Sequence, residues 1–537
     1  MHKTAIAALA AVAFLFGAAE TSWGQTDAID LLIKDARVVD GSGGPAYRGD
    51  IAVRGDTIVR IAPRIDGRAT KVVNARGKVI APGFIDVHVH ARDGIFAVPT
   101  ADNYVRQGVT TLVEGPDGGS PLPVGLFLDR VAKTAIVPNF ATFVGQGSVR
   151  DSVMGTVDRR ATPEELEQMR QIVRQAMTEG AFGLSTGLFY VPGAFTPTDE
   201  VVELAKVAGQ MHGIHISHMR DEATRVLHSV RETIEIGEKG GLPTQITHHK
   251  IIGALNWGKS VDTLRMVDEA RARRVDVTID QYPYTASSTS IHAALLPAWA
   301  NEGGRPRLLE RLKDASARPR IRAETIRLIE EERGGGDPHN VQISACEWDS
   351  SLAGKRLSQV TIARKLEPTV ENAADTVLWM IEQGECAAIF HAIDEDDLQR
   401  ILQHPVTMIA SDGSIPIYGQ ASPHPRSYGT FVRVLGRYVR ELKVLTLEDA
   451  VRKMSGSPAK RLGLADRGLL KEGLKADLVV FDPDTVRDTA TFEKPHQYAE
   501  GVSLVVINGQ VVFENARMTR ARPGRVLYGP AREGSER

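Results

Sequence analysis

Cysteine is scarce in this 537-residue chain, which carries only Cys346 and Cys386. The two residues form no CxxC pair, so the sequence excludes a disulfide framework of several bridges and a cysteine-rich zinc site. A single bridge between them stays open, because it depends on a geometry that the sequence does not give. The net charge of -2 is also small and gives no basis for a nucleic-acid partner or an anionic membrane surface.

Long apolar runs are missing too. Beyond residue 25 no uninterrupted apolar run approaches the ~18 residues of a membrane span. Residues 1–25 combine a basic start, an apolar stretch over 5–19 and small residues before Gln25. This layout is typical of a secretory signal peptide, and an uncleaved anchor is the alternative. We therefore expect a periplasmic or secreted protein with no stable membrane anchor after cleavage near residues 22–24.

Both ends of the remaining chain show the pattern of short β-strands. In residues 29–79 apolar runs of four to six residues are broken by Asp-Gly, Arg-Gly and Pro-Gly, and residues 476–518 repeat this style. Such runs with turn residues between them predict a small β-sandwich or barrel. We expect residues 26–82 and 466–537 to build this small β-sandwich domain together.

Between the two ends, over residues 83–465, strand patterns alternate with helix patterns. Residues 162–180, for example, begin with a threonine N-cap and end at a glycine, as helices do. Repeated βα units predict an α/β fold with a parallel sheet, and their number favours a (β/α)8 TIM barrel. Residues 301–345 are charged and helical, so we expect an insertion there. Counting "CAAIF" (386–390) and "VTMIAS" (406–411), nine strand candidates compete for eight places.

Polar residues close several of the apolar runs. His88 and His90 lie two apart on one strand, so both side chains leave the same face. His218, His248 and Asp412 each end a later strand. In a barrel the ends of the strands share the face where active sites assemble. A divalent metal would account for so many ionisable groups in one place, whereas the HxH pair alone would also suit core or surface histidines.

Other histidines fit a metal site less well. His212 and His215 fall out of phase with the strand or before its end, so they are interpreted as structural. His249 faces the opposite side from His248 in a regular strand. His391 follows another apolar run and stays open as a candidate.

Six segments resemble the D-aminoacylases, the N-acyl-D-amino-acid deacylases of the amidohydrolase superfamily: "APGFIDVHVH", "GIHISHMRDE", "ITHHKIIG", "DQYPYTAS", "MIASDG" and "HPRSYGTFVRVLG". The resemblance runs from about residue 29 to the C-terminal strands. It implies a metal-dependent barrel that hydrolyses the amide bond of N-acyl-D-amino acids, a small-molecule substrate. It also implies a tightly bound zinc on His218 and His248, and a second divalent position on His88, His90 and Asp412.

One metal ligand departs from the family pattern. The family usually has a cysteine after the second strand, where this chain reads "TTLVEGPDGG" (110–119). Ungapped counting from the HxH puts Asp117 in that place, but Glu114 closes the strand and has the longer arm. We predict that Glu114 is the metal ligand and that Asp117 belongs to the turn. A carboxylate here would accept Mn, Co or Ni more readily than a thiolate would.

The same resemblance implies the chemical roles. Asp412 would be the general base, and His218 or Tyr282 would help to polarise the amide carbonyl. Lys250, Tyr282, Ser288 and Arg426 would bind the substrate, although Arg426 also suits a solvated loop. Two other functions stay open: an amidohydrolase of another linkage, such as an isoaspartyl-type dipeptidase or a cyclic amidase, and a non-catalytic binding protein. The latter predicts the loss of at least one metal ligand.

Overall fold

The computed structural model describes residues 28–532. The predicted signal peptide, 1–25, lies outside the described residues and stays a prediction. Within residues 28–532 no helix is both long enough and apolar enough to cross a membrane.

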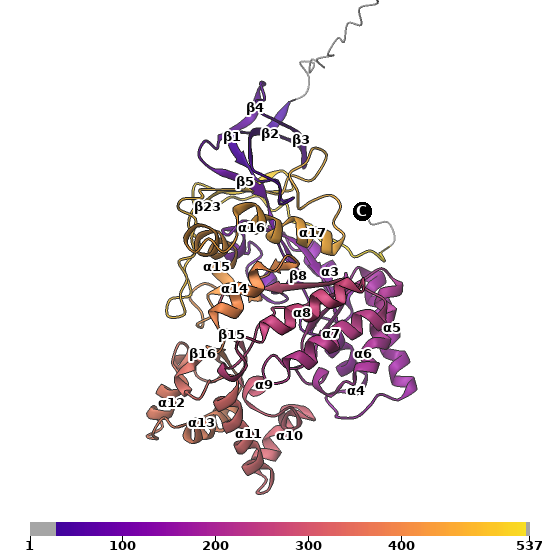
Figure 1. Cartoon of the computed structure of the whole chain (residues 1–537), viewed down its shortest axis with the longest axis vertical. Coiled ribbons are helices and arrows are strands. Elements are labelled where there is room, and N and C mark those ends of the chain that lie inside the picture. The colour runs from indigo at the N-terminus through magenta and orange to yellow at the C-terminus, as the bar shows by residue number, and fades with distance from the viewer. Residues whose placement is uncertain (1–27, 533–537) are drawn as a thin grey trace, which may run out of the picture.

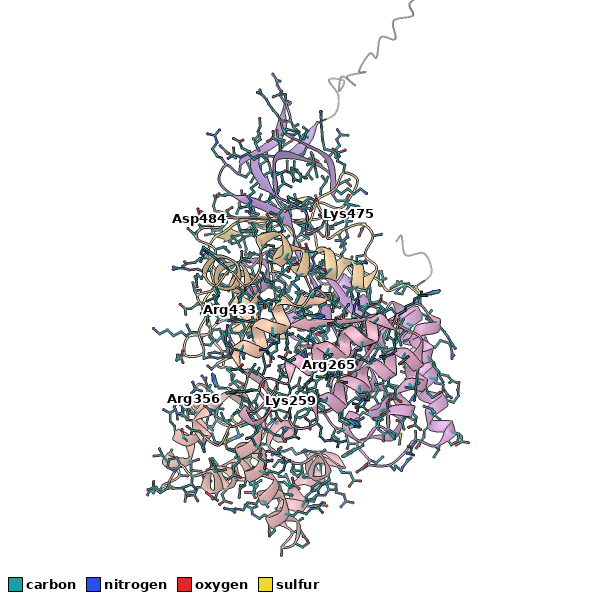
Figure 2. The ribbon with its side chains drawn as sticks, viewed as in Figure 1. Lys259, Arg265, Arg356, Arg433, Lys475 and Asp484 are labelled. Carbon is teal, nitrogen blue, oxygen red and sulfur yellow. A yellow bond between two sulfur atoms is a disulfide. The ribbon has the colours of Figure 1, made fainter. Side chains whose placement is uncertain are left out.

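The strands of the two chain ends form one nine-stranded sheet, at the top of Figure 1. The link between the two ends is the antiparallel pair of β5 with β20, whose register joins Val79 to Phe481. An ion pair of 2.9 Å between Lys475, labelled in Figure 2, and Asp56 also joins the two ends. The strands pair within a single sheet, where a sandwich was expected. They are β1 (Ile29–Val38), β2 (Tyr47–Arg54), β3 (Thr57–Ala62), β4 (Ala69–Asn74), β5 (Val79–Pro82), β20 (Leu478–Phe481), β21 (Val502–Ile507), β22 (Gln510–Glu514) and β23 (Arg517–Met518).

The centre of the molecule is built from parallel strands in three sheets. Most of their residues are buried on both faces, as parallel strands covered by helices require. One sheet holds β6 (Phe84–Asp86), β8 (Val109–Glu114) and β9 (Asn139–Thr142), and a small one holds β7 (Val89–His90) and β19 (Gly413–Ser414). The largest holds β10 (Val144–Gly145), β11 (Gly183–Gly187), β12 (Ile214–His218), β13 (Thr244–Ile246), β14 (Val277–Gln281) and β18 (Thr407–Ile409).

Helices follow the parallel strands along the chain, and α5 shows why they form where they do. Thr162 caps its first turn in a capping box with Glu165, Pro163 opens it, and Gly180 ends it with a φ of 116°. The helices of this region are α1 (Gly94–Ala97), α2 (Asp102–Val105), α3 (Val124–Lys133), α4 (Gln146–Met154), α5 (Pro163–Glu179), α6 (Thr198–Gln210), α7 (Val226–Gly240), α8 (Ser260–Ala272), α14 (Glu395–Gln403), α15 (Arg426–Arg433), α16 (Leu447–Met454) and α17 (Gly456–Leu462).

The insertion is larger than the sequence predicts. It leaves the parallel sheet after β14 and returns at β18, and it forms its own three-stranded antiparallel sheet. In Figure 1 its helices α10 to α13 lie at the bottom, below β15 and β16. "CAAIF" is therefore not a strand of the parallel sheet, which removes the ninth candidate. Cys346 and Cys386 form a disulfide within this antiparallel sheet. Its elements are β15 (Ser287–Ser290), α9 (Ile291–Leu295), α10 (Gly304–Lys313), α11 (Ala317–Glu331), β16 (Val341–Cys346), α12 (Leu357–Ala363), α13 (Val370–Gln383) and β17 (Cys386–Phe390).

Candidate metal centre

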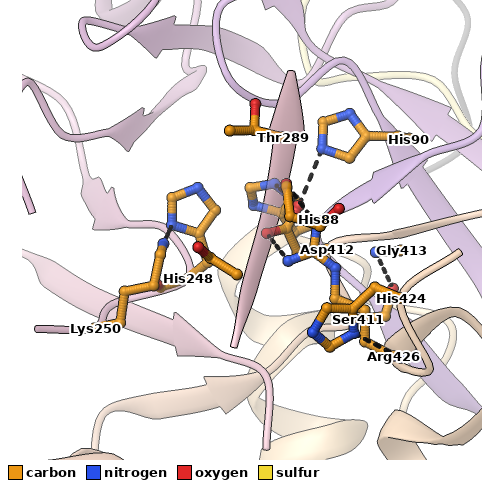
Figure 3. A network of polar contacts seen from close by, with 12 residues as sticks. His88, His90, His248, Lys250, Thr289, Ser411, Asp412, Gly413, His424 and Arg426 are labelled. Carbon is orange, nitrogen blue, oxygen red and sulfur yellow. Dashed lines mark hydrogen bonds and ion pairs between the residues drawn. The ribbon is translucent and has the colours of Figure 1, made fainter. Parts of the chain in front are cut away.

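The HxH segment lies beside Asp412: His88 follows β6, and His90 ends β7. Nε2 of His90 lies 3.0 Å from Oδ1 of Asp412, as Figure 3 shows. Nε2 of His88 lies 3.4 Å from the same oxygen, and His88 is fully buried. These two histidines and Asp412 therefore meet as predicted, although His90 and Asp412 are separated by 322 positions in the sequence.

The two later histidines lie against each other on the neighbouring strands. Nδ1 of His218 is 2.8 Å from Nε2 of His248. Asp117 lies between this pair and the first one: Oδ1 is 3.4 Å from Nε2 of His88 and 3.4 Å from Nε2 of His248. Oδ2 is 3.5 Å from Nε2 of His90 and 3.6 Å from Nδ1 of His218. One carboxylate thus faces all four histidines.

Glu114 does not take part, and the prediction that it completes the cluster is wrong. Its carboxylate accepts hydrogen bonds from the backbone amides of Ala91 and Arg92 and from Nε of Arg92 at 3.0 Å. Glu114 thereby holds the segment that follows the HxH. The turn after β8 then carries Asp117, with a left-handed φ of 57°, onto the face where the histidines gather. Ungapped counting therefore selects the acid that the structure places among the histidines.

The donor set fits a divalent metal in two overlapping groups. Ligand atoms of His88, His90, Asp117 and Asp412 lie within 4.8 Å of one another, and so do those of Asp117, His218 and His248. Several of these buried atoms have no hydrogen-bond partner: Nδ1 and Nε2 of His88, Oδ1 of Asp117 and Nε2 of His218. Buried polar atoms without partners are costly, and imidazoles with carboxylates are ligands that zinc accepts.

A second acid supports this cluster from outside. Oδ1 of Asp280, at the end of β14, accepts a hydrogen bond of 2.7 Å from the backbone N–H of His248. The same oxygen lies 3.9 Å from Nδ1 of His88. A carboxylate behind a histidine fixes the orientation of the ring, as is common around metal ligands. Asp280 is a residue that the sequence analysis missed, although it too closes a parallel strand.

Burial and charge shift the protonation of the cluster in opposite directions. Burial by itself lowers the pKa of His90, but Asp117 and Asp412 raise it to about 9. Burial lowers the pKa of His218 to about 4, against the opposing charge of Glu222. Burial would raise the pKa of Asp412, yet Arg426 and His88 hold it well below its usual range. Asp412 is therefore ionised at neutral pH.

A cavity of about 270 Å³ opens beside the cluster. Its lining includes Lys250, Arg333 and Arg426, which together form what we call the cationic wall. Arg426 contributes to this wall, with Nη1 2.7 Å from Oδ2 of Asp412. Lys250 donates from Nζ to Nδ1 of His248 at 2.7 Å and makes a short contact with Glu222. Arg333, from the insertion, donates from Nη2 to Glu222 at 3.3 Å.

The other two residues predicted to bind substrate take different places. Ser288 lines the cavity, and its carbonyl accepts a hydrogen bond of 3.4 Å from Arg426. Tyr282 lies beneath Arg426, whose guanidinium carbon is 4.8 Å from the centre of the ring. The Tyr282 hydroxyl is buried and has no hydrogen-bond partner.

Sequence reasoning missed two charged residues that line the cavity, Glu222 and Arg333. Glu222 stands four residues after His218 within "SHMRDE", so its position in that motif was an available signal. Arg333 follows α11 in the insertion, and no motif points to it. His391, left open as a candidate, is in neither group of possible metal ligands and packs against Phe492, 4.6 Å between ring centres. His212 is exposed, and His215 lies buried between two threonine hydroxyls, and neither belongs to the groups of possible metal ligands.

The comparisons with known proteins agree with this geometry. The profile of the amidohydrolase family matches residues 71–513, so the chain belongs to the amidohydrolase family. It is 37% identical to a D-aminoacylase of Alcaligenes xylosoxydans xylosoxydans over 94% of this chain and 99% of that protein. It is 36% identical to an N-acyl-D-glutamate deacylase of the same organism over 93% of this chain and 96% of that protein.

A solved structure is similar over the same extent. The N-acyl-D-glutamate deacylase of Bordetella bronchiseptica, complexed with zinc and a phosphonate that mimics the tetrahedral intermediate, is 34% identical. The alignment has a TM-score of 0.80 and covers 94% of this chain and 100% of that chain.

Proposed function

We propose that the protein hydrolyses the amide bond of N-acyl-D-amino acids, giving a D-amino acid and a carboxylate. The observation that carries the proposal is the position of Asp117, whose carboxylate faces all four histidines. This cluster lies beside the cavity that has the cationic wall. The relatives with matching length include a D-aminoacylase and an N-acyl-D-glutamate deacylase. All the predicted histidine ligands and Asp412 are present, which argues against a non-catalytic binding protein.

The metal proposed for the centre is zinc, held by His218, His248 and Asp117, with a second divalent position on His88, His90, Asp117 and Asp412. The relative from Bordetella bronchiseptica, crystallised with zinc, supports this choice. A divalent metal supplies a water of lowered pKa and polarises a carbonyl oxygen.

The residues of the chain supply the rest of the mechanism. Asp412 accepts the proton of the attacking water and returns it to the departing amine nitrogen. Arg426 and Lys250 bind the α-carboxylate of the substrate. Ser288 and the hydroxyl of Tyr282, which has no other partner, complete this subsite. The cationic groups thereby orient the α-carboxylate relative to the amide that is cleaved.

We also propose that the three parallel sheets close into one (β/α)8 barrel. Two contacts support closure between the first and last strands: the backbone N–H of Asp412 donates to the carbonyl of His88 at 2.9 Å, and β7 pairs with β19. Between β9 and β11, the N–H of Phe182 donates to the carbonyl of Thr142 at 2.9 Å. In such a barrel the candidate metal centre would lie at the ends of the strands.

Export to the periplasm or the medium is likewise a proposal. The signal-like residues 1–25 suggest it, and the disulfide of Cys346 with Cys386 suits an oxidising compartment. Fractionation of the host cell tests it. The mature protein is expected outside the cytoplasm, with a new N-terminus near residue 25, and a full-length cytoplasmic protein would contradict it.

Turnover of N-acetyl-D-methionine tests the activity, with N-acetyl-L-methionine and a set of dipeptides, including an isoaspartyl one, as comparisons. The D-isomer is expected to be hydrolysed at least a hundredfold faster than the L-isomer, about 2.7 kcal/mol in transition-state binding. Turnover of dipeptides alone would overturn the proposal.

A further inference from the structure

The cationic wall of the cavity has more positive than negative charge. Lys250, Arg333 and Arg426 are each at least nine-tenths buried. Two carboxylates face them: Glu222 lies against both Lys250 and Arg333, and Asp412 lies against Arg426. Asp117 faces the four histidines. Three cations therefore meet two carboxylates, which leaves one positive charge of the wall uncompensated.

The guanidinium of Arg333 is fixed in the cavity lining by its ion pair with Glu222 and by two further contacts. Its Nη1 donates to Oγ of Ser287 at 3.2 Å, and its guanidinium carbon lies 5.0 Å from the centre of the Phe189 ring. Its Nε is buried without a hydrogen-bond partner. The hydroxyl of Tyr282 is buried without a hydrogen-bond partner as well. These free donors and the single excess charge match one carboxylate group.

We propose that Arg333 is a further substrate-binding residue and that the cavity accepts one carboxylate, so that the enzyme prefers N-acyl-D-amino acids with uncharged side chains over those of D-aspartate and D-glutamate. This inference rests on the proposed function and names its substrate class. The relatives leave the choice open, because they include both a D-aminoacylase and an N-acyl-D-glutamate deacylase.

The physical reason is the cost of a second carboxylate in a small buried cavity. The α-carboxylate neutralises the single excess charge of the wall. A side-chain carboxylate would then lose its hydration without gaining an unpaired cation, and it would lie near Glu222 and Asp412, which repel it. Glu222 is the group that sets this balance, because it compensates one of the two cations that it contacts.

The test compares N-acetyl-D-glutamine with N-acetyl-D-glutamate, which have nearly the same shape and differ in side-chain charge. The wild-type kcat/KM is expected to favour the glutamine compound by about tenfold or more. Glu222→Gln adds one uncompensated positive charge and should reduce this preference at least about tenfold. Equal kcat/KM values in the wild type, or a preference that Glu222→Gln leaves unchanged, would overturn the proposal.

Arg333→Met tests the arginine separately. This variant removes the excess positive charge, so KM for N-acetyl-D-glutamine should rise roughly tenfold while kcat changes less. Arg333→Lys keeps the charge and should bring KM part of the way back to the wild-type value. Arg322→Met is the matched control, because Arg322 lies on α11 and pairs with Asp375 at the surface. A KM for Arg333→Met equal to that of the control would contradict the assigned role.

Equilibrium binding keeps this inference distinct from the proposed function. Calorimetry with D-glutamine and D-glutamate on the metal-loaded protein measures the charge preference without turnover. If no N-acyl-D-amino acid is hydrolysed, the proposed function fails while the charge preference is still measured. If hydrolysis occurs and D-glutamate binds as tightly as D-glutamine, only the single-carboxylate claim fails.

Discussion

Arg426 and Asp412 form a buried ion pair in which Nη1 lies 2.7 Å from Oδ2. The other oxygen of Asp412, Oδ1, faces His88 and His90 at 3.4 and 3.0 Å. The two oxygens of the proposed general base therefore have different partners, a permanent cation and two imidazoles. Although burial would raise its pKa, this arrangement keeps Asp412 ionised and able to accept a proton.

Replacing the base tests its assigned role. Asp412→Asn keeps the shape of the side chain and removes the proton acceptor, so kcat is expected to fall by roughly 10²- to 10⁴-fold. Arg426→Met should chiefly raise KM, because it removes a donor to the α-carboxylate. Arg433→Met, on the same helix but paired with Asp488, is the control. An Asp412→Asn enzyme with near-normal kcat would show that another group accepts the proton.

Glu114 is expected to act on stability and not on metal content. Glu114→Gln weakens the bonds to the backbone of Ala91 and Arg92, a loss of about 1–3 kcal/mol in the free energy of unfolding. Thermal unfolding and metal analysis of the purified variant measure both quantities. A lower melting temperature with the wild-type metal content is expected, and loss of metal with unchanged stability would reverse the assignment.

Acid should destabilise the fold through His215. Burial, with a smaller effect of Arg461, lowers the pKa of His215 to about 3 in the folded chain, against ~6.5 when unfolded. The unfolded state therefore binds the proton first, and the stability present above pH ~6.5 is lost as the pH falls toward 3. The drop in melting temperature between pH 7 and 5 should be smaller in His215→Gln. The exposed neighbour His212, changed to Asn, should leave it unchanged.

The disulfide is expected to stabilise the insertion. It closes a loop with a sequence separation of 40 between Cys346 and Cys386, for which a stabilisation of about 2–4 kcal/mol is typical. The double variant Cys346→Ser/Cys386→Ser should be cleaved faster by protease within residues 287–390. Equal cleavage rates for the variant and the wild type would show that the core of the insertion is sufficient alone.

The sequence predicts the parts of the site that follow from strand periodicity. His88, His90, His218, His248 and Asp412 close apolar strands, and the structure brings all of them together. The alternation of strands and helices likewise predicts the parallel strands, because each covered strand is a continuous apolar run.

Sequence reasoning fails where a turn or a distant segment sets the direction of a side chain. Glu114 closes its strand as expected, yet Arg92 and two backbone amides hold it away from the centre. Asp117 reaches the centre through a left-handed residue, which no strand pattern predicts. Arg333 enters from the insertion, and its contact with Glu222 depends on how two separate units pack.

The most direct test of the account is restoration of activity to chelated protein by added zinc. Hydrolysis of N-acetyl-D-methionine and bound metal are measured together, for the wild type and for Asp117→Asn. We predict that the wild type loses activity on chelation and regains it in step with the zinc that it binds, whereas Asp117→Asn regains neither. Full activity of the metal-free wild type, or normal zinc binding and turnover by Asp117→Asn, would contradict the account.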